Sequence, residues 1–339
     1  MREVRLRHER WPLREPFRIS RGVKTAAEVV VAEISEMGLT GRGEGVPYAR
    51  YGESVEGVLA QLESASGALR EGMTRAELQA FMKAGAARNA LDCALWDLEA
   101  QQSARPVWEL ACLPAPVPLV TAQTISLDSP DKMAEAARRH AHRPLLKLKL
   151  DGQYVAERVA AVRAAAPTAR LIVDANEGWT PEGLESALPA LESLGIELLE
   201  QPLPAGADAA LDGIGRAVPL AADESCHTRA DLEALSRRYD YVNVKLDKTG
   251  GLTEALAMIT EARRLGLGVF VGCMICTSLS IRPALLAAAQ ADYVDLDGPL
   301  WLAQDREGGV RLGEDGRLWP GEAGLWGGLS PRLVLQTPT

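Results

Sequence analysis

Short apolar runs and amphipathic segments alternate along the chain from residue 118 onward. Five of the apolar runs are LLKLKL (145–150), LIVD (171–174), IELLE (196–200), VPLAAD (218–223) and YVNVK (241–245). The segments between them repeat apolar residues at the interval typical of helices. The charged residues that close these runs follow one another at intervals of 22 to 26 residues, about the length of a strand, a loop and a helix. The pattern predicts a repeating β/α architecture with a parallel sheet.

Three further apolar runs bring the number of predicted strands to eight. PLVTAQT (118–124) precedes the five runs above, and LGVFVGC (267–273) and YVDLD (293–297) follow them. No comparable helical segment follows the eighth strand, so we predict a (β/α)7β barrel, a modified TIM barrel. The segment GGVRLGEDGRLWP (308–320) is predicted instead to form a hairpin around Glu314-Asp315-Gly316.

The beginning of the chain follows a different pattern. EVRLRHERWPL, TAAEVVVAEISEMG and LTGRGEGV predict an antiparallel meander with turns at Met37-Gly38 and at the glycines that follow. Residues 86–102 have helical periodicity. We therefore expect an α/β protein with three parts. These are an α+β capping domain at 1–113, the barrel catalytic domain at 114–303, and a C-terminal segment at 304–339 that returns to the capping domain and completes it.

Composition narrows the function classes. A chain of 339 residues is long enough for one barrel and a smaller domain. A net charge of −9 argues against nucleic-acid binding, which requires clustered Lys and Arg. No apolar run is long enough to cross a bilayer, so we expect no membrane partner. The first residues contain no signal-peptide core, and five irregularly spaced cysteines suggest a reducing compartment, so we expect a cytoplasmic protein.

Charged residues close five successive predicted strands: Lys149, Asp174, Glu200, Asp223 and Lys245. In a parallel β/α barrel all strands end on one face, where active sites lie. The sequence therefore places three carboxylates between two lysines in a single pocket. One carboxylate at a strand end is more often structural, but three on consecutive strands at near-constant spacing indicate a metal site. Their hard oxygen ligands suit Mg²⁺, with Mn²⁺ as an alternative.

The lysine pattern adds candidate bases. Lys147 and Lys149 stand two residues apart, so their side chains point to the same side of the strand. By itself this pattern is typical of a strand with one solvated face. Helices cover the outside of a barrel, however, which favours leucines outward and lysines inward. Lys245 would reach in from the sixth strand, and two amines on opposite sides of one carbon can remove a proton from either face.

Two more residue groups are candidates for substrate contacts. Asp295 and Asp297 stand two residues apart at the eighth strand, where two carboxylates without a third ligand suit an ammonium group. A capping or turn role for the DLDGP segment is the alternative. Cys273 and Cys276 have CxxC spacing, but no second such pair or nearby histidine completes a zinc site. Cys273, at the end of the seventh strand, is therefore expected to line the pocket.

With these residues in view, the chain resembles the enolase superfamily, specifically its muconate-cycloisomerase-like subgroup. The matching motifs are KLK (147–149), DAN (174–176), EQP (200–202), DES (223–225) and VKLDKTGG (244–251). Within the subgroup it is most similar to the bacterial L-Ala-D/L-Glu, or dipeptide, epimerases. That likeness runs nearly end to end, through PYARYGES (47–54) and DLDGPLWLA (295–303) among other segments.

The resemblance implies roles for residues at matching positions. Lys149 and Lys245 would be the two acid/base lysines, and Asp174, Glu200 and Asp223 the ligands of one Mg²⁺. Asp295 and Asp297 would hold the α-ammonium group of a dipeptide, and Thr124, Lys147 and Cys273 would contact the substrate. These epimerases use an Arg to grip the glutamate side chain; Lys24 stands there in this chain, with Arg21 nearby. Lys lacks the planar fork that binds a carboxylate through two hydrogen bonds.

The function expected from the resemblance is Mg²⁺-dependent epimerisation at the C-terminal residue of a dipeptide, L-Ala-D/L-Glu foremost, in murein peptide turnover. It would proceed by 1,1-proton transfer between two lysines through a metal-stabilised enolate. A cycloisomerase or an o-succinylbenzoate-synthase-like dehydratase on the same scaffold is the alternative. A catalytically silent dipeptide-binding barrel would leave Lys149 and Lys245 without a role. The sequence leaves a homo-oligomer open.

Overall fold

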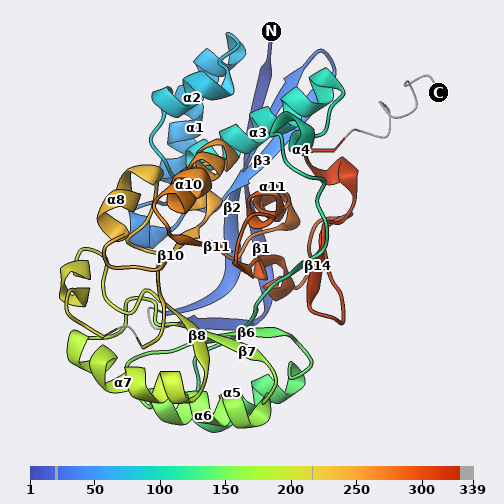
Figure 1. The fold of residues 1–339 in the computed structure, drawn as a ribbon. Coiled ribbons are helices and arrows are strands. Elements are labelled where there is room, and N and C mark those ends of the chain that lie inside the picture. Colours follow the sequence, from blue (N-terminus) through green and yellow to red (C-terminus); the bar gives the residue numbers. More distant parts are fainter. Residues whose placement is uncertain (20–21, 216, 329–339) are drawn as a thin grey trace.

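A computed structural model describes residues 1–19, 22–215 and 217–328, and Figure 1 shows an upper α+β domain above a barrel. Three antiparallel strands form the sheet of the upper domain in the order β1 (Glu3–Ile19), β2 (Gly22–Glu36) and β3 (Leu39–Gly45). Met37 and Gly38 connect β2 to β3 with φ angles of 53° and 81°. Positive φ at both central residues is typical of a tight hairpin turn. The predicted meander is thus confirmed.

Helix α3 (Ala86–Ser103) packs directly against the backbone of β3. A Cβ atom added at Gly41, Gly43 or Gly45 would lie 2.0–2.2 Å from a carbonyl oxygen of α3. The carbonyls belong to Ala94, Ala90 and Ala86, which recur every fourth residue on one face of the helix. Alternate glycines on the strand and regularly spaced alanines on the helix therefore permit the close approach. Helices α1 (Val55–Arg70) and α2 (Arg75–Phe81) pack on α3.

Eight parallel strands form the barrel, each hydrogen-bonded to its neighbour in chain order. They are β5 (Gln123–Ile125), β6 (Leu145–Lys149), β7 (Arg170–Asp174), β8 (Ile196–Glu200), β9 (Leu220–Ala222), β10 (Tyr241–Val244), β11 (Gly268–Gly272) and β12 (Tyr293–Asp295). The Ala122 N–H donates to the Val294 carbonyl at 2.8 Å, which joins the first strand segment to the last. The predicted barrel is confirmed.

Helical segments connect successive strands and cover the outside of the barrel. They are α5 (Pro130–Arg139), α6 (Val155–Ala165), α7 (Pro181–Ser193), η2 (Asp208–Leu211), α8 (Leu232–Leu235), α9 (Leu246–Thr249), α10 (Leu252–Arg264) and α11 (Ser278–Ala288). Between β8 and β9, the described residues form only the short 3₁₀ helix η2, because prolines and glycines interrupt this segment of the chain. No helix of the described chain has the length and apolar character needed to cross a membrane.

The predicted first barrel strand, 118–124, is divided in the structure. Its first part forms β4 (Leu119–Val120), which pairs antiparallel with β14 (Arg317–Trp319), and only the later part joins the barrel as β5. Strand β14 also pairs with β13 (Arg311–Leu312), so the predicted hairpin is present. This hairpin lies at the N-terminal end of the barrel strands. Beyond it, the Trp326 indole N–H donates to the Cys93 carbonyl of α3 at 3.0 Å.

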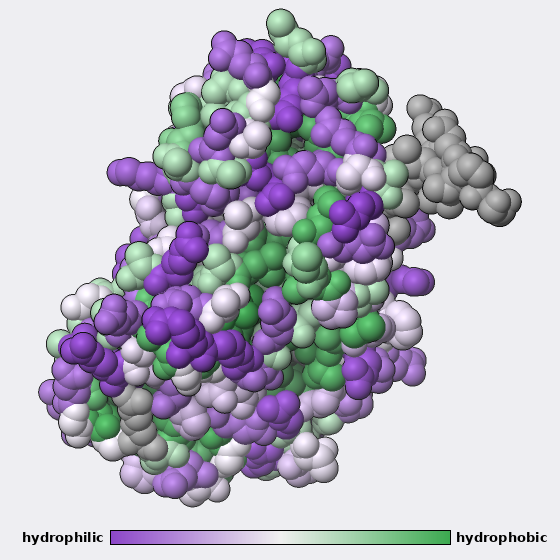
Figure 2. All heavy atoms as spheres, turned by 45° about the horizontal axis from the view of Figure 1, so that its top comes forward, coloured by the Kyte–Doolittle hydropathy of each residue, from purple (hydrophilic) through white to green (hydrophobic). Residues whose placement is uncertain are grey.

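Strands β1 and β2 continue beyond the meander as a long ribbon that bends over the barrel (Figure 1). The Ala303 N–H donates to the Pro12 carbonyl at 2.8 Å, which attaches the ribbon to the chain after β12. Farther along, the Phe17 ring packs edge-on against Trp301 with 4.6 Å between ring centroids. On the face shown in Figure 2, apolar residues are exposed mainly in the middle of the molecule, between more hydrophilic upper and lower parts.

Buried polar contacts hold the capping domain on the barrel. Asp247, in α9 after β10, accepts hydrogen bonds from the Val46 N–H and the Asn89 amide, each at 2.8 Å. Glu44 of β3 is fully buried and accepts a hydrogen bond from the Thr277 N–H at 2.8 Å. Arg306, from the C-terminal segment, contacts the same carboxylate at 3.0 Å. The two domains are therefore joined through carboxylates removed from water.

Replacing Asp247 with Asn is expected to stabilise the protein at alkaline pH. Burial raises the pKa of Asp247 from 3.8 to about 7, so the folded state binds this proton more tightly than the unfolded state does. Stability of the wild type therefore falls as pH rises from about 4 to about 7. The Asn variant lacks this titration, and its advantage in unfolding free energy at pH 8 is at most about 4 kcal/mol. Urea unfolding should give the Asn variant a higher unfolding free energy than the wild type at pH 8 and no such advantage near pH 4. The same difference in unfolding free energy at both pH values would contradict this account.

Candidate active site

The barrel register brings the charged strand ends into one row. Lys149 lies opposite Asp174, and Asp174 lies opposite Glu200, in the pairing of β6, β7 and β8. Asp223 follows the last residue of β9, and Lys245 follows the last residue of β10. Since parallel strands share one direction, all five side chains lie at the same end of the barrel. The repeat in the sequence thus corresponds to a spatial cluster.

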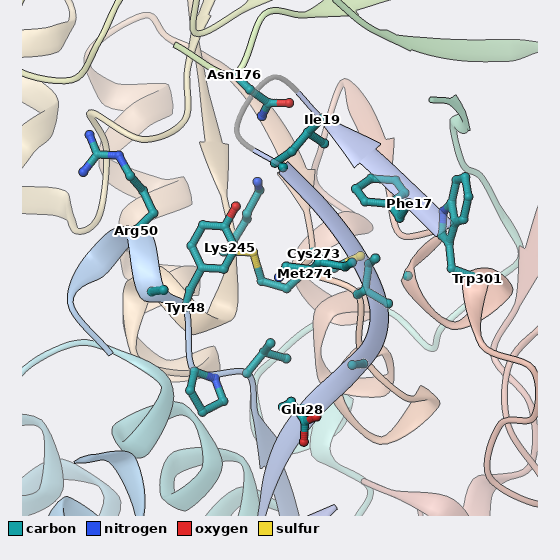
Figure 3. A pocket seen from close by; sticks show the side chains of 18 of the residues that line it. Phe17, Ile19, Glu28, Tyr48, Arg50, Asn176, Lys245, Cys273, Met274 and Trp301 are labelled. Atoms are coloured by element: carbon teal, nitrogen blue, oxygen red, sulfur yellow. The ribbon is translucent and has the colours of Figure 1, made fainter. Parts of the chain in front are cut away.

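A pocket of about 740 Å³ lies between this end of the barrel and the capping domain. Nine of the residues predicted to act at the site line it: Lys24, Thr124, Lys147, Lys149, Asp223, Lys245, Cys273, Asp295 and Asp297. Figure 3 shows the rings of Phe17 and Trp301 on one side of the pocket and Tyr48 on another. Arg21, the remaining predicted substrate contact, lies outside the described residues.

The two candidate bases enter the pocket from opposite sides. Lys149 ends the second barrel strand and Lys245 follows the sixth, so half of the eight-stranded barrel separates them. The Lys149 amine donates to Asp174 Oδ2 at 2.5 Å, and the Lys245 amine donates to Asp223 Oδ2 at 2.6 Å. Burial opposes the charge on Lys245, but Asp223 and Glu200 together raise its pKa above the ordinary value. Both amines are therefore fixed by carboxylates.

Lys147 lies between the acidic residues and is completely buried. Its amine is 2.7 Å from Asp295 Oδ2, 2.6 Å from Glu200 Oε2 and 3.1 Å from Asp174 Oδ2. Burial by itself would lower its pKa, but these three carboxylates raise the pKa well above the usual range. Lys147 therefore supplies a permanent positive charge inside the site, in contrast to a proton-transferring base.

The carboxylates Asp174, Glu200 and Asp223 have the oxygen ligands of a divalent-metal site, and Lys147 contacts two of them, Asp174 and Glu200. Among the described residues, no three acidic, histidine or cysteine side chains stand together as metal ligands. Glu200 Oε2 is buried, and the Lys147 amine lies 2.6 Å from it, with no further donor among the described residues. Burial and then repulsion by Asp174 raise the pKa of Glu200 to about 8. A cation beside Glu200 would relieve both conditions, so these residues fit Mg²⁺.

Gln201, which sequence reasoning did not single out, connects two of the candidate ligand segments. It follows Glu200, is fully buried and has a left-handed φ of 38°. Its side-chain oxygen accepts hydrogen bonds from the Asp223 N–H at 2.9 Å and the Ser225 N–H at 3.2 Å. Its amide donates to the Tyr239 hydroxyl at 3.1 Å. Gln201 therefore sets the Asp223 backbone relative to Glu200.

Lys248 is a second residue that the sequence analysis did not assign. It is buried and donates to the Asn243 carbonyl at 2.8 Å and to Asp223 Oδ1 at 2.5 Å. Asn243 in turn donates through its side chain to Glu200 Oε1 at 2.7 Å. Asp223 is thus held by Lys245 on one oxygen and by Lys248 on the other. The only sequence signal for Lys248 was its place in VKLDK (244–248), three residues after a predicted base.

Asp295 and Asp297 form an acidic wall of the pocket. Strand β12 ends at Asp295, and Asp297 lies in the turn before η4 (Gly298–Trp301). The prediction that the eighth strand continues to Asp297 was therefore wrong. The chain turns there because Gly298 and Pro299 follow. Asp297 Oδ2 accepts the Thr124 N–H at 2.9 Å, and burial, then Asp295, raise the pKa of Asp297 to about 6. Asp295 Oδ1 is buried without a donor among the described residues, which suits an incoming ammonium group.

Two family models match this chain, and together they cover most of it. Residues 1–111 match the mandelate racemase/muconate lactonizing enzyme N-terminal domain, and residues 132–325 match the enolase C-terminal domain-like family. The chain belongs to the enolase superfamily. Its capping domain and barrel correspond to these two matched regions, and the cluster of lysines and carboxylates lies at the mouth of the superfamily's barrel.

Characterised relatives and solved structures of the superfamily are similar over nearly the whole chain. The L-Ala-D/L-Glu epimerase of Escherichia coli (strain K12) is 52% identical over 309 residues, 91% of this chain and 96% of the relative. An Agrobacterium tumefaciens enolase family member with homology to dipeptide epimerases, solved with sodium and L-Ala-L-Glu, is 51% identical with a TM-score of 0.94, covering 96% of this chain and all of that one.

A dipeptide epimerase from Cytophaga hutchinsonii, solved with Mg and the dipeptide D-Ala-L-Val, is 30% identical. Its TM-score is 0.88, and the match covers 98% of this chain and 96% of that one. The superfamily fold is therefore retained across relatives whose bound dipeptides differ in the C-terminal residue.

In this superfamily member, Lys24 lies on the ribbon side of the pocket. Its amine is 4.6 Å from the centre of the Tyr48 ring, within the range of a cation–π interaction. Tyr48 belongs to the capping-domain segment that leads into η1 (Ala49–Tyr51). Cys273 lies just after β11 and lines the pocket, as predicted from its place at the strand end. Lys24 therefore brings positive charge to the part of the pocket formed by the capping domain.

Proposed function

We propose that this superfamily member is a Mg²⁺-dependent dipeptide epimerase that acts at the α-carbon of the C-terminal residue. The observation that carries the proposal is the placement of Lys149 and Lys245 on opposite sides of one buried acidic site. L-Ala-D/L-Glu is the preferred substrate class, supported by the Escherichia coli and Agrobacterium tumefaciens relatives and by the positive charge of Lys24 in the pocket. Murein peptides would supply such dipeptides, and the cytoplasm is the expected compartment.

Each group of residues has a distinct task in this reaction. Asp174, Glu200 and Asp223 would hold Mg²⁺, which when bound supplies electrostatic stabilisation for negative charge on the substrate carboxylate. Lys147 adds a fixed positive charge beside them. Asp295 and Asp297 bind the ammonium group of the N-terminal residue, and this contact fixes which carbon lies between the two bases.

Proton transfer uses the two remaining lysines. One lysine, neutral at the start, removes the α-proton through its amine and becomes an ammonium group. The other, protonated at the start, delivers a proton to the opposite face and becomes neutral, so the configuration inverts and the total proton count is unchanged. Phe17 and Ile19 of the ribbon line the pocket, and their apolar side chains would keep water away from the α-carbon while it carries negative charge.

A solvent-exchange experiment tests the proposal directly. The enzyme is incubated with L-Ala-L-Glu and Mg²⁺ in D₂O, and deuterium at the glutamate α-carbon is followed by NMR. We expect incorporation together with formation of L-Ala-D-Glu, and neither without Mg²⁺. A library of dipeptides with other C-terminal residues, compared between wild type and Lys24→Arg, tests the side-chain assignment. Absence of exchange with every dipeptide would overturn the proposal.

Asp297→Asn is expected to lower kcat/KM for L-Ala-L-Glu by about 100-fold. The variant loses one charge of the ammonium site, and truncating a buried charged contact costs about 3 kcal/mol. For a substrate without an ammonium group, such as an N-acylated glutamate, the kcat/KM of Asp297→Asn should equal that of the wild type. Asp292→Asn is the matched control, because Asp292 precedes the same strand but faces solvent and pairs with Arg263. Unchanged dipeptide turnover in Asp297→Asn would favour a cycloisomerase or dehydratase.

A further inference from the structure

A short turn of the capping domain reaches the barrel at the edge of the pocket. This turn, residues 48–53, contains η1 and is closed by Glu53, which accepts the Tyr48 N–H at 3.0 Å. Tyr51 packs edge-on against His227 of the loop after β9, with 4.5 Å between ring centroids. The turn thus supports Lys24 through Tyr48 on one side and contacts the segment that follows Asp223 on the other.

Arg50, in the middle of this turn, makes a two-pronged ion pair with Glu177 of the barrel. Arg50 Nε is 2.7 Å from Glu177 Oε2, and Nη2 is 2.6 Å from Oε1. The Glu177 side chain is only 7% exposed, whereas that of Arg50 is 39% exposed. Glu177 Oε1 also accepts the Ala205 N–H at 2.8 Å, from the loop after β8. Figure 3 shows Arg50 beside Tyr48 at the rim of the pocket.

Glu177 belongs to the segment that begins with the candidate ligand Asp174. Asn176 and Glu177 both have left-handed φ angles, of 45° and 66°, which side chains other than Gly seldom adopt. The Asn176 N–H donates to Asp174 Oδ1 at 2.8 Å, and the Glu177 N–H donates to the Gln201 carbonyl at 2.9 Å. This uncommon conformation needs support from outside the segment, and the contact between the Glu177 side chain and Arg50 contributes to that support.

From this geometry we infer that the Arg50–Glu177 ion pair is a positioning latch for catalysis. The ion pair holds the 48–53 turn of the capping domain against the segment that carries Asp174. It thereby sets the position of Lys24 and Tyr48, which would contact the substrate side chain, relative to the candidate metal ligands. The inference rests on the proposed function, because it assigns the latch to the binding of a dipeptide side chain. Arg50 and Glu177 are positioning residues, acting through Tyr48, Lys24 and Asp174.

The chain contains a matched ion pair that joins no domains. Arg170 and Glu197 also interact through two guanidinium nitrogens, at 2.9 and 2.7 Å from Glu197 Oε2. They lie at the starts of β7 and β8, whereas Glu177 follows the other end of β7. Exposed pairs of this kind contribute little to stability. Arg170→Met therefore controls for the loss of an arginine and of an ion pair as such.

The test compares Arg50→Met, Arg50→Lys and Glu177→Gln with Arg170→Met in steady-state epimerisation of L-Ala-L-Glu. We expect Arg50→Met and Glu177→Gln to raise KM about tenfold with a smaller change in kcat. Arg50→Lys, which keeps the charge but not the fork, should recover part of the loss. The Arg50→Met/Glu177→Gln double variant should be no worse than the poorer single variant, as expected for two residues acting as one unit. Arg170→Met should match wild type.

Backbone hydrogen–deuterium exchange, measured without substrate, provides a readout independent of activity. Arg50→Met should accelerate exchange both in residues 48–53 and in residues 174–178, while Arg170→Met should leave both segments unchanged. If wild type shows no epimerisation, the proposed function fails while the exchange data still test the latch. Equal KM values and equal exchange rates for Arg50→Met and Arg170→Met would overturn the inference.

Discussion

Lys245→Met is expected to abolish epimerisation of L-Ala-L-Glu, with a loss of about 10⁴-fold, and Lys149→Met is expected to do the same. Inversion at one carbon requires a base on one face and an acid on the other, and each variant lacks one of them. Each variant retains the other amine, however, which can still exchange the α-proton of one epimer with solvent. The two variants should therefore catalyse exchange of opposite epimers.

The measurement is α-deuterium incorporation into L-Ala-L-Glu and L-Ala-D-Glu, followed separately for each variant. Lys132→Met, at an exposed lysine of α5, is the control and should behave as wild type. Thermal unfolding checks that the loss of the Lys245–Asp223 or Lys149–Asp174 contact leaves the protein folded. Exchange of the same epimer by both variants, or epimerisation by either, would refute the assignment of one lysine to each face.

The strand ends could be predicted because a β/α repeat imposes its own geometry. Parallel strands in a barrel begin and end at common faces, so the spacing of Lys149, Asp174 and Glu200 translates into the row observed across β6, β7 and β8. The opposite placement of Lys149 and Lys245 follows from strand number alone. Site residues carried by regular elements are therefore accessible from sequence periodicity.

Contacts made by loops and by isolated polar residues carry no such periodic signal. Arg50 and Glu177 stand 127 residues apart, and nothing in their spacing indicates that they meet. Gln201 was visible only as part of a motif, because its role depends on a left-handed backbone and on tertiary partners. The 118–124 run is divided because β4 pairs with β14, which lies about 200 residues farther along the chain.

One packing feature could have been predicted and was not. The alternate glycines of β3, at 41, 43 and 45, oppose alanines 86, 90 and 94 of α3, which recur at one helical face. A strand with glycine at every second position has no side chains on one face, and a helix with alanine at every fourth position presents a flat surface. Together these two patterns indicate a close strand–helix contact. Sequence reasoning attributed the glycines only to turns.

Glu200→Gln is expected to lower Mg²⁺ affinity at least 100-fold and to reduce turnover in parallel. The substitution preserves the shape of the side chain and an oxygen that can accept from Asn243, at 2.7 Å in the wild type. It removes the negative charge from a buried candidate ligand whose second oxygen contacts the Lys147 amine at 2.6 Å and has no further donor among the described residues. Lys147 keeps its contacts with Asp295 and Asp174, so the fold should persist.

Titration calorimetry with Mg²⁺ and thermal unfolding at increasing Mg²⁺ concentrations measure this effect. A ligand at 100 times its Kd stabilises a folded protein by about 2.7 kcal/mol, so wild type should gain several degrees in Tm where the variant gains none. Glu197→Gln, three residues earlier on β8, removes a partly exposed carboxylate paired with Arg170 and should bind Mg²⁺ as wild type does. Equal Mg²⁺ affinity in Glu200→Gln and wild type would place the metal elsewhere, because a buried carboxylate that binds a dication cannot lose its charge without weakening the complex.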